Sequence, residues 1–103
     1  MGVTPNILFE VTSSLGKRVR VTEDYWQKIV TTKHPLMAGC EDLVKGILAQ
    51  PEVVRRSRKD QSVFLYYGRA EKRYCCVVVR HLNGDGFIVT AYITDRIKIG
   101  DAI

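Results

Sequence analysis

Residues 74–94 read YCCVVVRHLNGDGFIVTAYIT, and this stretch predicts two strands joined by a turn. Its first eight residues form an almost continuous apolar run, which is typical of a strand covered on both faces. The asparagine–glycine pair that follows favours a hairpin turn. Strict alternation after the turn places Thr90 and Tyr92 on one face together with Ile88, and Ala91 on the other. The stretch therefore predicts the centre of an antiparallel sheet.

Upstream of this hairpin, the spacing of apolar residues predicts two helices. Thr22 is suited to cap the first helix, and the apolar positions after it recur at helical spacing. The dipeptide His34-Pro35 ends this helix, because the residue before a proline is disfavoured in helical conformation. A second apolar stripe predicts a helix over residues 40–49.

Strands flank the two helices on both sides. Residues 7–12 and 18–22 predict an N-terminal β-hairpin, and the alternation at residues 63–67 adds a third strand to the meander. Residues 52–61 are interpreted as a basic connection. The order of these elements predicts an α+β fold, with the N-terminal β-hairpin and two helices packed on an antiparallel β-meander.

The chain has 103 residues, 46% of them hydrophobic, so residues 1–103 are expected to form a single domain with an ordinary core. This composition excludes collagen-like and intrinsically disordered chains. The sequence shows no signal peptide and no apolar run of membrane-spanning length, so we expect a soluble, cytoplasmic protein without a membrane partner. Its three cysteines have neither zinc-site nor disulfide-framework spacing, so we expect reduced thiols, no metal and no cofactor.

The net charge of +5 is concentrated in about a quarter of the chain. Residues 55–80 carry eight Lys and Arg against two acidic residues, whereas the remainder carries eight against nine. This excess favours a polyanionic partner, nucleic acid first, although a charge run is more commonly a solvated face. The residues expected to bind RNA are the cations Arg55, Arg56, Arg58 and Lys59, with Tyr66 and Tyr67 stacking on bases.

Several common types of catalytic site are absent from the sequence, and the residue types that remain (His, Arg, Lys, Thr and Tyr) can act on a phosphodiester without a metal. The sequence has no Gly-rich nucleotide loop, no GxSxG, no HExxH and no paired carboxylates at strand ends. His34 is the first candidate, since it stands at the end of a helix and Pro35 restricts its exit. A histidine there is more often a plain helix-end residue. His81 is expected to be an exposed turn residue.

Arg80, Thr90 and Tyr92 supply the neighbours that His34 would need. Thr90 and Tyr92 lie about 7 Å apart along a strand, so their hydroxyls can hold a phosphate or orient a base, although such alternation is also ordinary strand composition. Arg80 ends the central strand, and a guanidinium pairs with phosphate in bidentate fashion. We expect all four to converge in one concave patch beside the cations at residues 55–59.

The order of several short motifs resembles the phage-associated branch of the barnase/EndoU/colicin/RelE-like (BECR) nuclease superfamily. In chain order the motifs are GKRVRVT at 16–22, Trp26 with Ile29, His34-Pro35, QPEVV at 50–54, VVVR at 77–80 and the strand from Phe87 that ends in Thr-Ala-Tyr at Tyr92. The resemblance implies helices followed by an antiparallel sheet of about four strands, which agrees with the fold class predicted from the residues.

The resemblance also implies a metal-independent endoribonuclease of toxin or effector type, in which a ribose 2′-OH attacks the adjacent phosphate and a cyclic phosphate is left. On this basis His34 would be the general base or acid, Arg80 the phosphate clamp, and Thr90 with Tyr92 the orienting pair. The chain departs from the family at Leu36, where an acidic residue often follows the His-Pro pair.

Two functions without chemistry compete with this hypothesis. A basic sheet face alone predicts an RNA-binding module, whose affinity depends on salt and is unchanged by His34→Ala. A toxin-like surface that serves an antitoxin or immunity protein predicts a protein-interaction module. A separation above about 10 Å between His34 and the face of Thr90 and Tyr92 would exclude the enzyme, because proton transfer needs hydrogen-bond reach.

Overall fold

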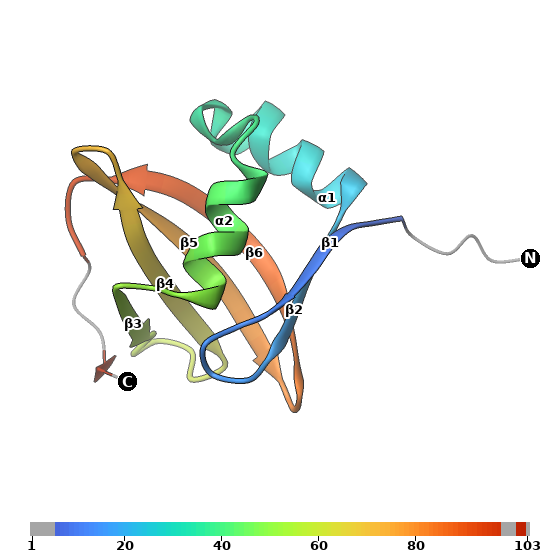
Figure 1. Ribbon diagram of the computed structural model, residues 1–103. Coiled ribbons are helices and arrows are strands. Elements are labelled where there is room, and N and C mark those ends of the chain that lie inside the picture. Colours follow the sequence, from blue (N-terminus) through green and yellow to red (C-terminus); the bar gives the residue numbers. More distant parts are fainter. Residues whose placement is uncertain (1–5, 98–100, 103) are drawn as a thin grey trace, which may run out of the picture.

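The computed structural model describes residues 6–97 and 101–102 and has the predicted α+β fold (Figure 1). Its elements, in chain order, are β1 (Ile7–Thr12), β2 (Arg18–Thr22), α1 (Glu23–Lys28), the π-helical turn η1 (Ile29–Lys33), the 3-10 turn η2 (Pro35–Met37), α2 (Glu41–Ala49), β3 (Val53–Arg56), β4 (Val63–Ala70), β5 (Arg73–Leu82), β6 (Asp85–Thr94) and β7 (Asp101–Ala102). The interpretation of residues 52–61 as a connection is wrong for β3, whose two arginines hide the apolar alternation of a strand.

The described strands form one sheet in the order β1-β2-β6-β5-β4-β3-β7. Strands β4, β5 and β6 make the predicted antiparallel meander. The N-terminal hairpin extends the same sheet, because β2 pairs with β6 in parallel. Asn83 and Gly84 form the turn between β5 and β6, and Asn83 has the positive φ of 50° that such two-residue turns require.

A β-bulge interrupts β6 at Val89. The register between β5 and β6 shifts between Val78 and Val79, which leaves Val89 as an extra residue on β6. Ile88 and Ala91 are consequently both buried in the core under the helices. Their predicted placement on opposite faces is therefore wrong, because strict alternation does not anticipate a bulge.

Helix α2 lies across one face of the curved sheet, and the core forms beneath it (Figure 1). Gly68 on β4 permits this contact, since a Cβ there would stand 2.4 Å from Cγ1 of Ile47. Trp26, Ile29 and Val30 bury one side of the first helix, as the apolar spacing predicts. The predicted catalytic residues of β5 and β6 lie on the opposite face of the sheet.

Candidate functional site

His34 lies where the first helix ends. Its backbone N–H donates to the Ile29 carbonyl over 2.7 Å, and its φ of −138° and ψ of 77° leave the helical region, as expected before Pro35. The half-buried His34 ring lies against β6, with its centroid 5.6 Å from that of Tyr92 and 37° between the ring planes. The fold therefore brings these two predicted residues together.

Thr90 and Tyr92 share one face of β6, as predicted, but their hydroxyl oxygens are buried. The Tyr92 hydroxyl interacts with the side chains of Tyr67 and Cys76, and burial raises the pKa of this phenol far above its ordinary value. In the described chain the Thr90 Oγ1 has no hydrogen-bond partner. In this arrangement the two hydroxyls do not reach an exposed phosphate, whereas the Tyr92 ring is placed to orient His34.

Arg80 lies on the same face of the sheet, and its side chain is 46% exposed. Its Nη1 donates to Oδ2 of Asp60 over 3.2 Å and to Oγ of Ser62 over 3.0 Å. Hydrogen bonds from Ser62 and the charge of Arg80 hold the pKa of the Asp60 carboxyl below its usual value. A guanidinium has five N–H donors, so a contact through Nη1 leaves those on Nε and Nη2 to bind an anion.

The four cations predicted to bind RNA divide into two groups. Arg55 and Arg56 belong to β3, which lies three strands from β6, or about 14 Å at the usual strand spacing. Arg58 and Lys59 lie in the loop after β3, and this loop also supplies the two side chains that bond Arg80. Arg58 and Lys59 are therefore linked to Arg80 through their own loop, whereas two strands separate Arg55 and Arg56 from β6.

Tyr66 and Tyr67 do not stack on RNA bases in this structure, because both side chains are fully buried. Tyr66 belongs to the core under α2, and its hydroxyl donates to Oγ of Ser13 over 3.0 Å. Tyr67 lies on the opposite face, where it meets the Tyr92 hydroxyl. Their predicted stacking role is wrong, since β4 is covered on both faces at these positions.

His81 is packed into the structure, and its interpretation as an exposed turn residue is wrong. Its ring stacks on Phe64 with centroids 3.9 Å apart and 12° between planes, and its Nε2 lies 2.9 Å from the Tyr66 hydroxyl. Burial, with a contribution from the charge of Lys17, lowers the pKa of His81 to about 4. This histidine is neutral at pH 7 and has a structural role, which leaves His34 as the candidate for proton transfer.

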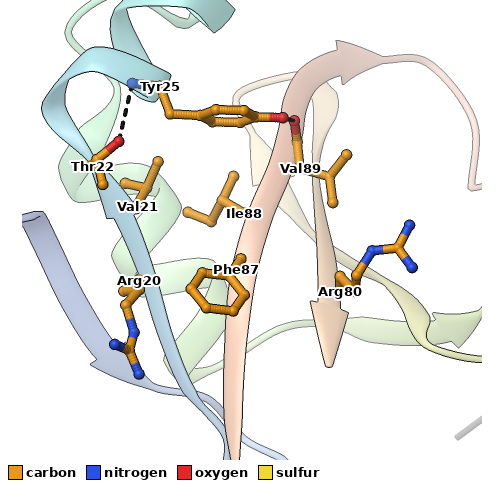
Figure 2. A pocket seen from close by; sticks show the side chains of 8 residues that line it. All are labelled: Arg20, Val21, Thr22, Tyr25, Arg80, Phe87, Ile88 and Val89. Atoms are coloured by element: carbon orange, nitrogen blue, oxygen red, sulfur yellow. Dashed lines mark hydrogen bonds between the residues drawn. The ribbon is translucent and has the colours of Figure 1, made fainter. Parts of the chain in front are cut away.

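A pocket of about 280 Å³ lies beside the bulge in β6 (Figure 2). Its lining is largely apolar and consists of Arg20, Val21, Thr22, Tyr25, Arg80, Phe87, Ile88 and Val89. Of these lining residues, only Arg80 is among those that the sequence predicts to form the site. The pocket was missed because it depends on the parallel pairing of β2 with β6 and on the bulge, and neither feature leaves a motif in the sequence.

No family model matches the chain, and neither the curated proteins nor the solved structures give a significant match. Within residues 6–97 and 101–102, no helix has both the length and the apolar character to cross a bilayer. The same residues contain no cluster of three or more His, Cys, Asp or Glu side chains that could hold a metal ion. The cysteines are free thiols, and burial raises the pKa of Cys75 to about 12, which makes it a poor nucleophile at neutral pH.

Proposed function

We propose that the chain is a metal-independent endoribonuclease. The observation that carries this proposal is the placement of His34 against Tyr92, although the two residues are far apart in the sequence and belong to different elements. An imidazole is the side chain best suited to move a proton near neutral pH. A half-buried ring held against an aromatic neighbour keeps a defined orientation, which proton transfer to or from a bound substrate needs.

In the proposed reaction His34 takes the proton from a ribose 2′-OH, whose oxygen then attacks the adjacent phosphorus. The bond from phosphorus to the 5′-oxygen breaks, and that oxygen takes a proton from solvent or from the protonated His34. The products are a 2′,3′-cyclic phosphate and a 5′-hydroxyl. Arg80 pairs with Phe87 and stands four positions along β5, about 13 Å, from Cys76, the partner of Tyr92. In the proposal its guanidinium donors that Asp60 and Ser62 do not use therefore bind a flanking phosphate of the RNA, not the one that is attacked.

Tyr92 acts in this proposal as a positioning residue. Its hydroxyl is buried and its pKa is raised, so it neither accepts a proton from the substrate nor carries a charge at neutral pH. Leu36, which replaces the acid expected from the family resemblance, is 70% exposed. His34 therefore acts without a carboxylate from that position.

The decisive experiment incubates purified protein with total RNA in EDTA and identifies the ends of the products. Wild type is expected to cleave and to leave cyclic phosphate ends, whereas His34→Ala is expected to be inactive. His81→Gln is the matched control, because it removes the other histidine of the chain. Cleavage by His34→Ala at the wild-type rate would contradict the proposal, as would the absence of any product from folded wild type.

An RNA-binding module without chemistry is the second candidate. The observation that favours it is the burial of the Thr90 and Tyr92 hydroxyl oxygens, which removes two groups from contact with substrate. The same purified proteins distinguish this module from the nuclease. The module predicts that wild type and His34→Ala bind RNA with equal affinity, that this affinity falls with salt, and that the RNA stays intact.

A further inference from the structure

The pocket beside the β6 bulge has two exposed aromatic walls. Figure 2 shows the ring of Tyr25 across one side and Phe87 on the other, with Val21 and Ile88 between them. The exposed fractions are 38% for Tyr25 and 42% for Phe87, in contrast to the fully buried Tyr66. Accessible aromatic rings are the surfaces on which single-stranded nucleic acids stack their bases.

The Tyr25 wall is held in place before any ligand binds. Its backbone N–H donates to Oγ1 of Thr22 over 3.2 Å, and its hydroxyl donates to the Val89 carbonyl over 2.8 Å. Val89 is the extra residue of the bulge, so its backbone departs from the regular ladder with β5. A wall fixed at both ends loses little conformational freedom on binding, which favours affinity.

Phe87 is flanked by two arginines across the sheet. It pairs with Arg20 on β2 and with Arg80 on β5, and Figure 2 shows one on each side of it. The Arg20 guanidinium carbon lies 5.3 Å from the Phe87 ring centroid, while Nη2 of Arg20 pairs with Asp85 over 3.1 Å. An apolar slot with cations on both sides matches a nucleotide, which joins a flat base to an anionic phosphate.

We infer that this pocket binds one nucleobase of a single-stranded RNA, stacked on Phe87 and enclosed by Tyr25. The identity of the ligand as RNA rests on the proposed function. Tyr92, which contacts His34, is three positions from Val89 and five from Phe87 along β6, about 10 and 17 Å at the rise of a strand, so the pocket and the candidate catalytic histidine lie along the same strand. A base stacked within a duplex does not enter such a slot, so the site selects unpaired RNA.

The test is an NMR titration of ¹⁵N-labelled protein with nucleoside 5′-monophosphates, with ribose 5-phosphate as the probe that lacks a base. A saturable shift of amides at residues 20–25 and 86–90 is expected with the nucleotides. Phe87→Leu, which keeps apolar bulk but removes the ring, is expected to raise the Kd at least about fivefold, and Phe87→Tyr to restore it to within about twofold. Leu82→Ala is the matched control, since Leu82 is an exposed apolar residue outside the pocket lining.

Three results would overturn the inference: no saturable shift at these amides, equal affinity for ribose 5-phosphate, or an unchanged Kd for Phe87→Leu. The titration is independent of cleavage, so the two proposals fail separately. Nucleotide binding by a wild type that leaves RNA intact would overturn the nuclease alone. Cleavage that depends on His34, without nucleotide binding at these amides, would overturn the base pocket alone.

Discussion

The two faces of the sheet use the same residue types for different purposes. On the face under the helices, His81 stacks on Phe64 and bonds the Tyr66 hydroxyl, and burial suppresses its charge. On the opposite face, His34 reaches Tyr92 from a helix end, and both histidines are half-buried, so the groups around each ring distinguish them. The candidate function of each histidine therefore depends on the groups around its ring, and not on its position next to an arginine or a proline.

The sharpest test of this comparison replaces each histidine in turn and measures both RNA cleavage and stability. His34→Ala is expected to reduce RNA cleavage by at least about 100-fold, because a general acid–base group contributes that much or more. The same change is expected to lower the free energy of unfolding by less than about 1 kcal/mol, since the ring is outside the core. Cleavage assays and urea unfolding of both variants measure this, with His81→Gln expected to lose stability and keep cleavage. An equal loss of cleavage in the two variants would break the comparison.

Helix α2 packs so closely on β4 that a substitution at Gly68 is expected to have a large effect on stability. A Cβ added there would stand 2.4 Å from Cγ1 of Ile47, so Gly68→Ala is expected to lower the free energy of unfolding by about 1–3 kcal/mol. Gly46→Ala in α2 is the control, because that Cβ meets nothing within 4 Å and alanine favours a helix, so stability should rise by about 0.5–1 kcal/mol. Chemical denaturation of the two variants measures these changes, and an unchanged stability in Gly68→Ala would show that α2 packs more loosely on β4 than this contact implies.

Lowering the pH is expected to destabilise the protein through His81, which lies on the face of the sheet under the helices. Its pKa falls from 6.5 to about 4 on folding, so between these values the unfolded chain binds more protons than the folded one. The stability that neutral His81 contributes is therefore complete above pH 6.5 and is lost as the pH falls towards 4. The expected loss is about 1–2 kcal/mol, since partial contact with solvent screens the charge. Urea unfolding at several pH values should show a flatter dependence for His81→Gln than for wild type; equal slopes would contradict this assignment.

The smallest expected effect concerns the loop cations on the side of the proposed site. If Lys59 contacts a phosphate, Lys59→Ala is expected to reduce the slope of log affinity against log salt by about one, with a few-fold loss of RNA affinity. Lys72→Ala, in the exposed turn between β4 and β5, is expected to leave both unchanged. Fluorescence anisotropy with a labelled single-stranded RNA at several salt concentrations provides the measurement. Equal slopes for the two variants would place the RNA elsewhere on the surface.

Local sequence signals predicted the parts of the fold that depend on neighbouring residues. Thr22 caps α1 as expected, because its hydroxyl accepts from a backbone N–H three residues later. The Asn83–Gly84 turn and the end of the helix at His34 follow from backbone preferences that these residues carry with them. These features do not depend on distant segments of the chain.

The positions of the candidate site residues depended on segments far apart in the chain. The bulge at Val89 and the burial of Tyr67 follow from how neighbouring strands pair, and no pattern within one strand reports either. The same holds for the pocket, where Tyr25 and Phe87 become walls only when α1 meets β6.

Composition and the order of neighbouring residues were enough to predict the α+β class, the meander, the helix ends and the concentration of positive charge, because these depend on residues within a few positions of one another. Contacts between distant segments set which histidine stacks on Phe64 and which reaches Tyr92, and which aromatic rings remain exposed. Whether a ring or hydroxyl meets solvent is set by what packs against it, and in this chain those neighbours come from β4, β6 and the helices.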